Sequence, residues 1–517
     1  MMHPYAYYPA RAARLWPDRI AVIDGERQLT FAELDARAGA LAAALIARGL
    51  QPGERVALIQ YNCIEFVVAA VAIARAGGVW CPMLGVLTAA EHGYIVGDSD
   101  ARFVLALTPE HLERARAVTP NADAAFGVGA FAGSADLLAG AQNAATLPGF
   151  DRPPQTLAQI LYTSGTTGKP KGVTHSFASV SAAMNFWATT FGHRPGDRVL
   201  GQLPLSHFCA RAMDSAWIGG AALVILRDPS PKPVIEAIAR HRVNFMLGVP
   251  TFLRMLLDDP ATESADLTSL RNIVYAAAPA APTLVERAMK RFGPVLNTGF
   301  GQTEAYGLCT YMGPAEHAQA LAQNPARLTS VGREFGAAQV MIRSEDGRPC
   351  APGEVGEICI CAPWVTPGFW KNAELDARRL QGGWLLTGDL GRMEPDGYVY
   401  LADRKEDMII SGGYNVYPAE VEHTLVAHEA VAECGVFAVP DDKWGEAVHA
   451  AVVLRPGAKV SEAELIAFVK ERVAYFKVPK AVHFTDALPK TPVGKIVRRV
   501  LREPYWAGHA RQVHGAG

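Results

Sequence analysis

A stretch rich in glycine, hydroxyl groups and lysine, Tyr162 to Gly172 (YTSGTTGKPKG), constrains this chain more than any other feature. It contains three glycines, four Ser or Thr residues and two lysines, and it follows a short apolar run, Leu157 to Leu161, that predicts a buried strand. Glycines let backbone N–H groups approach an anion closely, hydroxyls donate short hydrogen bonds, and lysines bring compact positive charge. The stretch therefore predicts a phosphate-binding loop at the end of a strand.

The spacing of this loop excludes the common nucleotide-binding pattern GxxxxGK[ST]. Two residues separate Gly165 from Gly168 where that pattern has four, and Pro170 stands where Ser or Thr would bind magnesium. A plain glycine-rich surface loop is the alternative that composition allows. The order of residues resembles the signature loop of the adenylate-forming superfamily, which includes acyl-CoA synthetases, peptide-synthetase adenylation domains and luciferases. The resemblance implies that ATP contacts Thr163, Ser164, Gly165, Thr166, Thr167, Gly168, Lys169 and Lys171.

Composition favours a globular enzyme of more than one domain. The chain has 517 residues, half of them apolar, and a net charge of −2, which gives no electrostatic argument for nucleic acid or an anionic membrane as a partner. The longest apolar run, Phe66 to Ala74, is too short to span a bilayer, and the first ten residues lack the pattern of a signal peptide. The eight scattered cysteines form no CxxC pair, so we expect a reducing cytoplasm.

Strand-like and helix-like segments alternate through the first part of the chain. This pattern predicts an α/β fold with a large N-terminal domain of mostly parallel sheets. Residues 120–154 lack periodicity and are expected to form a loose connector. After Val331, short strands separated by turns predict a small antiparallel region that closes the large domain. Helices are expected after the Thr30–Glu33 capping box and at Ile64 to Arg75, Pro418 to Val426 and Ser461 to Arg472.

The sequence predicts a domain boundary between residues 404 and 405. Residues 1–404 are expected to form the ATP- and acyl-binding domain. Residues 405–517 are expected to form a small mobile α+β lid domain that carries the catalytic lysine, and the part after Leu501 is expected to be a loosely held tail. Glu406 aligns with the pivot of the small domain in relatives, and a charged residue suits a segment that must be solvated in two conformations.

A second motif, Gly299 to Glu304 (GFGQTE), places two glycines beside a hydroxyl and a carboxylate. The resemblance implies that Thr303 contacts the α-phosphate and that Glu304, together with Thr163, ligates magnesium. A short donor suits an oxyanion, and a hard oxygen ligand suits a hard cation. An ordinary glycine turn with a solvated Glu304 is the alternative. Gly301 and Gln302 complete the implied nucleotide contacts of this motif.

Two further segments match nucleotide-binding parts of the family. Residues 276–280 (AAAPA) match a wall of the adenine and acyl pockets, which implies roles for Ala278 and Pro279, although these residues suit plain packing as well. Asp389, in TGD, and Arg404, in ADRKED, match residues that hold the ribose hydroxyls of ATP. A carboxylate that accepts two vicinal hydroxyl groups has suitable geometry for a ribose.

The last part of the chain carries the motifs implied for the thiol acceptor and for catalysis. Gly412 and Gly413 match the tunnel of the thiol acceptor, where the absence of a Cβ leaves room for a pantetheine arm, and two glycines also favour a hairpin turn. Lys495, in LPKTPVGKIVRR, resembles the catalytic lysine, which bridges the acyl carboxylate and the α-phosphate. An exposed structural lysine is the alternative.

His207, in LPLSHF, lies where relatives often carry an aromatic residue or His near the acyl entrance, which implies that it contacts the substrate or gates the pocket as part of the catalytic set. A packing histidine is the alternative. The expected pocket wall is mostly apolar or small, which favours a fatty or aromatic carboxylate. Its candidate residues are His207, Phe208, Met213, Val249, Tyr275, Ala276, Gly301 and Tyr306.

The resemblance thus implies an AMP-forming acyl-CoA synthetase that uses ATP, Mg²⁺ and coenzyme A, with a small carboxylic acid as substrate and a homodimer as the expected assembly. A stand-alone adenylation enzyme that passes an acyl or aminoacyl group to a carrier-protein thiol is the alternative, and Asp214 is a candidate for holding an amine. Luciferase-type oxygenation and a catalytically silent homologue are more distant alternatives. The intact set Lys495, Glu304 and Asp389 argues against the silent homologue.

Overall fold

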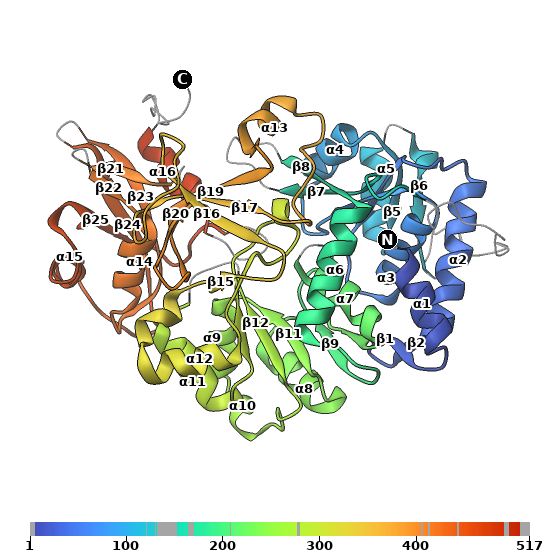
Figure 1. Cartoon of the computed structure of the whole chain (residues 1–517), viewed down its shortest axis with the longest axis horizontal. Coiled ribbons are helices and arrows are strands. Elements are labelled where there is room, and N and C mark those ends of the chain that lie inside the picture. The colour runs from blue at the N-terminus through green and yellow to red at the C-terminus, as the bar shows by residue number, and fades with distance from the viewer. Residues whose placement is uncertain are drawn as a thin grey trace. The chain divides into compact units, whose positions relative to one another are not determined.

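The structure is a computed structural model in which the chain divides into two compact units (Figure 1). The first contains residues 1–340 and 360–385, and the second contains residues 341–359 and 386–517. The predicted domain boundary between residues 404 and 405 stays a prediction. The residues that the structure describes are 6–119, 121–129, 131, 152–163, 170–206, 208–276, 280–404, 407–411, 414–441, 444–490 and 496–506.

A six-stranded sheet of the first unit carries the strand that leads into the phosphate loop. Its strand order is β6–β5–β3–β4–β7–β8, and every pairing is parallel except that of β7 with β8. One face of the sheet packs on a core that includes Ile59, Val104 and Ile160. The strands are β3 (Arg55–Ile59), β4 (Val79–Met83), β5 (Ala101–Ala106), β6 (Ala125–Gly127), β7 (Leu157–Thr163) and β8 (Lys171–Ser176).

A seven-stranded sheet of the same unit ends in the strand that leads into the GFGQTE motif. Its order is β13–β12–β11–β9–β10–β1–β2, and only the β1–β2 pairing is antiparallel. A two-stranded antiparallel ribbon joins β14 (Thr310–Tyr311) to β15 (Arg333–Glu334). The strands of the large sheet are β1 (Ile20–Asp24), β2 (Arg27–Thr30), β9 (Arg198–Gly201), β10 (Ala222–Ile225), β11 (Phe245–Gly248), β12 (Asn272–Tyr275) and β13 (Leu296–Thr298).

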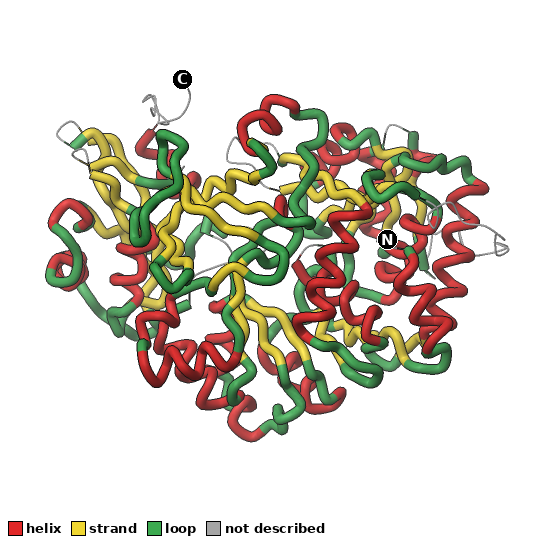
Figure 2. Tube along the Cα trace, in the orientation of Figure 1, coloured by secondary structure: helices red, strands yellow, loops and turns green. Residues whose placement is uncertain are grey.

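Helices alternate with these parallel strands, as Figure 2 shows by the red segments beside the yellow ones. The predicted capping box is confirmed, because the Thr30 hydroxyl accepts from Glu33 N (3.2 Å) while the Glu33 carboxylate accepts from Thr30 N (2.8 Å). The first unit contains α1 (Tyr7–Leu15), α2 (Phe31–Ala47), α3 (Ile64–Arg75), α4 (Ala89–Asp98), α5 (Pro109–Val118), α6 (Phe177–Phe191), α7 (Phe208–Gly219), α8 (Pro231–His241), α9 (Pro250–Asp258), α10 (Ala261–Ser264), α11 (Pro282–Phe292), α12 (Pro314–Gln323) and α13 (Ala373–Arg379).

The second unit is built on antiparallel sheets, so the predicted fold class is confirmed. One sheet has the order β16–β17–β19–β18, with β20 beside β19; the other has the order β22–β21–β24–β23, with β25 parallel to β24. Helices α14 and α15 pack against each other, and residues of both contribute to one apolar core. The elements are β16 (Gln339–Arg343), β17 (Gly356–Cys361), β19 (Trp384–Met393), β20 (Val399–Arg404), β21 (Ile409–Ser411), β22 (Tyr414–Val416), α14 (Pro418–Val426), β23 (Val431–Asp441), β24 (Gly445–Leu454), α15 (Glu462–Lys470), β25 (Ala481–Phe484) and α16 (Arg498–Trp506), whereas the residues of β18 (Leu380–Gln381) belong to the first unit.

Two expectations about irregular segments were wrong in part. The expected tail after Leu501 continues the helix α16 to Trp506, because the Trp506 indole donates to the Ala438 carbonyl (2.9 Å) and anchors the helix end on β23. The expected connector after residue 120 contains β6, which pairs with β5. Most of its remaining length, residues 132–151, lies outside the described residues.

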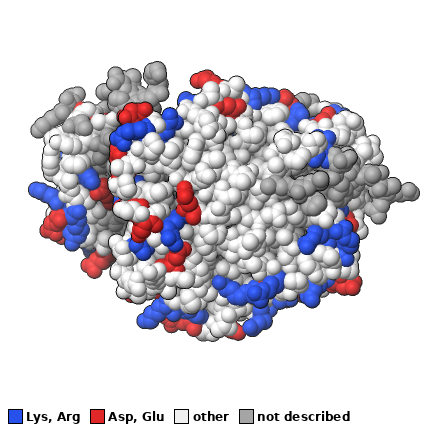
Figure 3. Space-filling model, in the orientation of Figure 1, with Lys and Arg blue, Asp and Glu red and all other residues white. Residues whose placement is uncertain are grey.

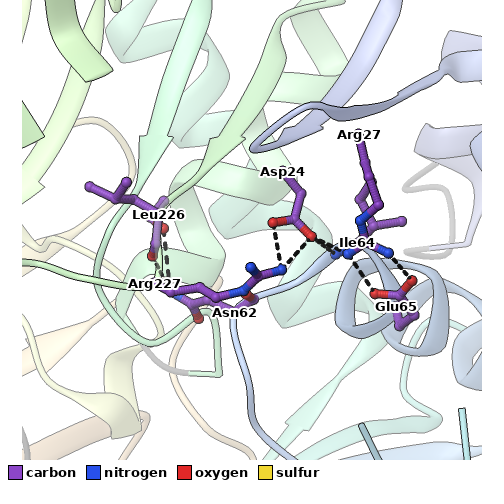
Figure 4. A network of polar contacts seen from close by, with 8 residues as sticks. Asp24, Arg27, Asn62, Ile64, Glu65, Leu226 and Arg227 are labelled. Carbon is purple, nitrogen blue, oxygen red and sulfur yellow. Dashed lines mark hydrogen bonds and ion pairs between the residues drawn. The ribbon is translucent and has the colours of Figure 1, made fainter. Parts of the chain in front are cut away.

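A buried carboxylate ties several elements of the first unit together (Figure 4). Asp24, at the end of β1, accepts from Arg227 at 2.7 and 2.9 Å and from the backbone N–H of Ile64 at 3.3 Å, and it also pairs with Arg27. Arg27 donates in turn to Glu65 (2.6 Å). We call Asp24, Arg27, Glu65 and Arg227 the Asp24 cluster. It links β1, the start of α3 and the segment after β10.

Asn62 joins the two sheets of this unit beside the Asp24 cluster (Figure 4). Its side-chain amide donates to the carbonyls of Leu203 (3.0 Å), Leu226 (3.1 Å) and Gly201 (3.3 Å). Asn62 follows β3 of one sheet, whereas the three carbonyls lie at or after the ends of β9 and β10 of the other. Gly201 is buried and Leu203 and Leu226 are partly buried, so the Asn62 amide supplies hydrogen bonds where water has little access. Both sheets are thereby held in a fixed relation at their carboxyl ends.

The charged surface matches the near-neutral composition. Figure 3 shows basic and acidic side chains intermixed on the visible face. Among the described residues, no helix is both long and apolar enough to cross a membrane.

Candidate functional site

The phosphate loop is flanked by the antiparallel pair β7 and β8. Thr163 and Lys171, the last and first residues of these strands, are direct partners in the ladder. Both side chains are partly exposed at this point. The six residues between 163 and 170 that we expect to contact ATP lie outside the described residues. The structure therefore brings the two ends of the loop together and fixes the distance that the loop has to bridge.

Tyrosines hold this end of the hairpin. The hydroxyl of Tyr162 donates to Asp98 at the end of α4 (2.6 Å), and burial together with this hydrogen bond raises the pKa of Tyr162. The hydroxyl of Tyr94, also on α4, donates to the carbonyl of Pro170 (3.1 Å). Both contacts attach a helix of the first unit to residues directly next to the loop. The flanks of the loop are thus fixed by side chains from a neighbouring helix as well as by the ladder.

Gly172 is required by packing on the other strand of the hairpin. A Cβ at this position would lie 2.9 Å from Ile160 Cγ2 and 3.0 Å from Trp370 Cβ, which real side chains do not tolerate without a shift. The Trp370 backbone N–H donates to the Gly172 carbonyl (2.7 Å). Glycine at this position therefore lets residues 368–370 lie directly against β8.

The GFGQTE motif forms a tight turn after β13. Gly299 and Gly301 face backbone carbonyls so closely that a Cβ would lie 2.2 Å from Thr310 O and 2.0 Å from Gly307 O, respectively. Thr303 begins a 3₁₀ turn, Thr303–Ala305, that ends at Tyr306 with φ of 49°. Only glycine fits the first and third positions of the motif, so its spacing reflects how closely the chain folds back on itself.

This turn is docked on the hairpin that flanks the phosphate loop. The His175 ring on β8 hydrogen-bonds the Thr303 carbonyl (2.9 Å) and lies against the Tyr306 ring at a centroid distance of 4.4 Å. The Tyr306 hydroxyl donates to Gln159 on β7 (2.7 Å), and the Glu304 carbonyl accepts from the Thr366 N–H (2.7 Å). Contacts on both sides therefore bring Thr303 and Glu304 to the same hairpin as Thr163 and Lys171.

His175 and Thr366 were not expected from the sequence. The Thr366 hydroxyl donates to the carbonyls of Thr174 and Gly368, both at 2.7 Å, and so joins residues 366–368 to β8. Neither residue belongs to a motif with a chemical pattern of its own. The only sequence signal for His175 is a polar residue inside a strand whose neighbours are buried.

The Glu304 side chain is partly exposed, as a ligand for an incoming cation has to be. Gln302, which directly precedes Thr303, accepts a hydrogen bond from Arg379 at the end of α13 (3.3 Å). Among the described residues no group of three or more His, Cys, Asp or Glu side chains could hold a metal ion by itself.

Asp389 and Arg404, the two expected ribose contacts, lie opposite each other in the second unit. They are direct partners at the end of the antiparallel β19–β20 ladder. The backbone at Asp389 is fixed because its N–H donates to the Thr387 hydroxyl (3.1 Å), while the preceding Gly388 N–H donates to Glu357 (2.9 Å). The side chain of Arg404 lies outside the described part. The structure brings these two residues together, as a shared ligand requires.

The candidate acyl wall is described only in part. Tyr275 is buried at the end of β12, and its hydroxyl hydrogen-bonds His317 Nε2 (2.8 Å). The other ring nitrogen of His317 contacts the Gly313 carbonyl (2.8 Å), so Nδ1 carries the proton and Nε2 accepts from Tyr275. Burial raises the pKa of Tyr275 and lowers that of His317. The Tyr275 ring is therefore held by α12 as a fixed neutral group.

Several expected site residues lie outside the described residues, and their roles stay predictions. The strands β21 and β22 pair Ser411 with Tyr414, so the two glycines between them connect the strands of a hairpin. The residues concerned are Ser164, Gly165, Thr166, Thr167, Gly168, Lys169, His207, Ala278, Pro279, Glu406, Gly412, Gly413 and Lys495.

Known proteins resemble this chain along nearly its whole length. The Medium/long-chain-fatty-acid–CoA ligase FadD8 of Mycobacterium tuberculosis is 34% identical over 508 residues, which cover 95% of this chain and 88% of that protein. The feruloyl-CoA synthase of an Amycolatopsis species is 35% identical, over 96% of this chain and 98% of that protein. The structure of the amide bond synthetase McbA from Marinactinospora thermotolerans matches with a TM-score of 0.88 and 31% identity, over 97% of this chain and all of that one.

The family comparison agrees with the two sets of motifs found above. The family described as AMP-binding enzyme matches residues 9–370, and the AMP-binding enzyme C-terminal domain matches residues 420–495. The first range includes the phosphate loop and the GFGQTE turn, and the second begins within α14 and ends at Lys495. The resemblance inferred from the sequence is confirmed: this chain belongs to the AMP-binding enzyme family of the adenylate-forming superfamily.

Proposed function

We propose that this protein is an ATP-dependent acyl-CoA synthetase, an acid–thiol ligase that forms AMP and pyrophosphate. It activates a fatty or aromatic carboxylic acid as an acyl-adenylate and transfers the acyl group to coenzyme A. The names of the two curated relatives, a fatty-acid–CoA ligase and a feruloyl-CoA synthase, support this reaction and both acid classes.

One observation carries the proposal. In the first unit the strands on both sides of the phosphate loop also hold the turn that contains Thr303 and Glu304, through His175, Tyr306 and Thr366. The turn with Thr303 and Glu304 is thereby held on the same scaffold as Thr163 and Lys171 by two side-chain hydrogen bonds and one between backbone groups. Such preorganisation supports nucleotidyl transfer, in which the protein mainly positions groups and stabilises developing negative charge.

In the first half-reaction a carboxylate oxygen of the acid attacks the α-phosphorus of ATP. The bond from the α-phosphorus to the bridging oxygen breaks, and pyrophosphate leaves with that electron pair. Thr303 donates a hydrogen bond to an α-phosphate oxygen, and the loop from Thr163 to Lys171 binds the departing phosphates. Lys495 neutralises charge between the acid carboxylate and the α-phosphate. Asp389 binds the ribose hydroxyls and so orients the nucleotide.

In the second half-reaction a thiol attacks the carbonyl carbon of the acyl-adenylate. The sulfur–carbon bond forms, the carbon–oxygen bond to phosphate breaks, and AMP leaves. The thiol proton passes to solvent. We propose that the lid turns about Glu406 between the two steps, so that Lys495 withdraws and the turn at Gly412 and Gly413 gives the pantetheine arm access.

The donor set at the first unit fits magnesium. Glu304 offers a partly exposed carboxylate and Thr163 a hydroxyl at the end of β7, and hard oxygen ligands of this kind are what magnesium prefers. When bound, the ion supplies positive charge to the phosphate oxygens. The few protein ligands are consistent with a cation that shares its coordination with substrate phosphates.

The acid is proposed to be apolar over most of its length. Met213, Tyr275 and Tyr306 are buried residues of the expected wall, and the Tyr275 hydroxyl is already bonded to His317. A polar group of the acid would therefore find few partners among these residues, whereas an alkyl chain or an aromatic ring would bury apolar surface.

A panel of acids tests the reaction and its substrate class together. Alkanoic acids of increasing length, hydroxycinnamic acids and amino acids are each incubated with ATP and magnesium, with and without coenzyme A, and AMP and ADP are measured. We expect AMP release that depends on an apolar acid and rises with coenzyme A. ADP as the product, or no exchange of labelled pyrophosphate into ATP with any acid, would contradict the proposal.

An acceptor other than coenzyme A is the second candidate, because a structural neighbour is an amide bond synthetase. The carrier-protein thiol expected as the alternative belongs in the same experiment. Preformed acyl-adenylate is offered to coenzyme A, to a phosphopantetheinylated carrier protein and to a primary amine, and the products are quantified. Coenzyme A is expected to react fastest. Sedimentation of the same protein tests the expected homodimer.

A further inference from the structure

We propose that Arg498 is a positioning residue for the adenylate-forming half-reaction. Its guanidinium group joins the base of the segment that carries Lys495 to Asp407 and to helix α14 through Glu422. This inference rests on the proposed function, because it assigns Arg498 a task in the step that Lys495 serves.

The segment that carries Lys495 leaves and re-enters the described fold at a paired position. Lys490 and Ile496 form an antiparallel bridge, and the Val497 N–H donates to the Pro489 carbonyl (2.8 Å). Lys490 also forms an ion pair with Glu433 on β23 (2.6 Å). Residues 491–495 therefore connect two points that the second unit holds next to each other.

Apolar packing supports the same base. Ile496 and Leu501 pack on a cluster that contains Phe437 and Leu488. A Cβ at Gly435 on β23 would lie 2.8 Å from Leu501 Cδ1 and 3.2 Å from Ile496 Cγ2, so the start of α16 lies directly on the strand. Small displacements of α16 would therefore displace Ile496, the residue that follows Lys495.

Arg498, the first residue of α16, anchors this helix by a forked contact. Its Nε and one terminal nitrogen donate to the two Glu422 carboxylate oxygens at 3.0 and 2.7 Å. Its other terminal nitrogen donates to Asp407 at 3.0 Å. The exposed fractions of the three side chains are 16% for Arg498, 16% for Glu422 and 20% for Asp407, so solvent screens these ion pairs little. Two-point contact between Arg and a carboxylate fixes direction as well as distance.

The two carboxylates belong to different parts of the second unit. Glu422 lies on α14, where it also accepts from the Val436 N–H of β23 (2.7 Å). Asp407 comes directly after Glu406, the expected pivot of the lid, and a terminal nitrogen of Arg502 lies 3.9 Å from the Asp407 carboxylate. We call Arg498, Asp407, Glu422 and Arg502 the Arg498 cluster. The cluster makes the residue after the pivot, α14 and the base of the lysine segment one rigid frame.

This frame gives Arg498 a specific consequence for catalysis. If Lys495 must reach a defined point between two anionic groups, an error of about 1 Å at its base is enough to cost on the order of 100-fold in rate. The second half-reaction does not use Lys495. Loss of Arg498 should therefore slow adenylate formation far more than thioester formation from a supplied adenylate.

The experiment compares the two half-reactions in full-length variants. Pyrophosphate–ATP exchange with an accepted acid measures the first, and thioester formation from synthetic acyl-adenylate and coenzyme A measures the second. For Arg498→Ala we expect the first rate to fall by about 10- to 100-fold and the second by less than about 2-fold. Arg498→Lys keeps the positive charge but cannot make the two-point contact, so its rate of adenylate formation should lie between those of the unchanged protein and Arg498→Ala.

Arg499→Ala is the matched control. Arg499 is the next residue of the same helix, has the same charge and is exposed, so both rates should stay within about 2-fold of the unchanged protein. Glu422→Gln removes the carboxylate charge and keeps an oxygen for the Val436 N–H. Glu422→Gln should also slow adenylate formation more than thioester formation, but by less than Arg498→Ala does. Guanidinium added to Arg498→Ala should restore part of its rate of adenylate formation.

A general weakening of the lid would give a different pattern. Equal loss of both half-reactions in Arg498→Ala, or equal behaviour of Arg498→Ala and Arg499→Ala, would overturn the proposal. If Arg498→Ala does not fold, the ratio of the adenylate-forming rate to the thioester-forming rate in Arg498→Lys and Glu422→Gln tests the proposal instead. If the unchanged protein exchanges no pyrophosphate with any acid, the proposed function fails instead.

Discussion

Two ion-pair clusters, one in each unit, are built on opposite plans. In the Asp24 cluster one buried carboxylate, with a side chain 3% exposed, is shared by two half-exposed arginines. In the Arg498 cluster one arginine is shared by two carboxylates, and all three groups are largely buried. The Asp24 cluster joins elements next to the ends of β1 and β10, whereas the Arg498 cluster joins segments next to the expected pivot and the expected catalytic lysine.

The difference suggests two uses of similar chemistry. The first unit holds its candidate nucleotide site by hydrogen bonds such as that of His175 with the Thr303 carbonyl, and the ion pairs of the Asp24 cluster lie between scaffold elements. The second unit holds the base of its lysine segment by the Lys490–Ile496 bridge, by apolar packing and by the charged side chains of the Arg498 cluster. We therefore expect changes in the Asp24 cluster to act on stability and changes in the Arg498 cluster to act on the ratio of the two half-reactions.

The largest effect should come from Lys495, the group that the Arg498 cluster is proposed to position. Lys495→Ala should reduce pyrophosphate–ATP exchange by about 100- to 1,000-fold, because one preorganised charge is lost in the transition state. Thioester formation from supplied acyl-adenylate should change little. Lys470→Ala, at an exposed site on α15, is the control and should leave both rates unchanged. An equal fall of pyrophosphate–ATP exchange and of thioester formation in Lys495→Ala would contradict the proposed difference between the two clusters.

Asp24→Ala should be the strongest test of the scaffold cluster. The change removes charge-assisted hydrogen bonds from two arginines and from the Ile64 N–H, and we expect the free energy of unfolding of the first unit to fall by about 3 kcal/mol. Denaturation in urea, followed by tryptophan fluorescence, measures the fall. Asp266→Ala, at an exposed pair, should cost less than about 0.5 kcal/mol. An altered ratio of half-reaction rates in Asp24→Ala would break the comparison.

Acid should destabilise the first unit through His193. Burial lowers the pKa of His193 from 6.5 to about 4, with a smaller opposing effect of the Asp197 charge. Because the folded state disfavours the proton, this contribution to stability is complete above pH 6.5 and is lost as the pH falls from 6.5 towards 4. The loss should be about 2 kcal/mol at pH 5. Thermal unfolding between pH 7 and 4.5 measures it, and His193→Gln should flatten the profile over that window.

The smallest changes in stability are expected at two helix caps of the same type, one in each unit. Thr30 with Glu33 caps α2, and Ser461 with Glu464 caps α15 with nearly the same hydrogen-bond lengths. Replacement of either cap residue by Ala should cost about 1 kcal/mol. Hydrogen exchange should increase in α2 for Thr30→Ala and in α15 for Ser461→Ala. Increased exchange across both units in either variant would mean that the units do not respond separately.

The sequence predicted the elements whose signals are local. Helices α3 and α14 have the expected bounds because their signals lie within one segment: an apolar run defines α3, and a proline at the first turn marks the start of α14. The nucleotide motifs were recognisable for the same reason, since each combines glycines with oxygen and nitrogen donors over a few residues. Of the expected site, the structure brings Thr163 and Lys171 together with the Thr303 turn, and Asp389 together with Arg404.

Contacts between distant residues were not predictable in this way. Arg498 and Asp407 are 91 residues apart, and Asn62 reaches carbonyls 139 to 164 residues further along the chain. Nothing in the surrounding residues indicates such partners, because each is a polar residue in an otherwise ordinary segment. The continuation of α16 past Leu501 depends on the indole of Trp506 and the carbonyl of Ala438, which only the folded chain brings together.

The covered edge of β8 has a consequence for how copies of this protein behave in concentrated solution. β8 is the last strand of the six-stranded sheet, and an uncovered last strand can recruit strands from other molecules. Here Val173 forms a bridge with Phe369, and the backbone groups of Gly368 and Trp370 bond to β8. The hairpin beside the phosphate loop can thus remain accessible to a nucleotide without seeding intermolecular aggregation.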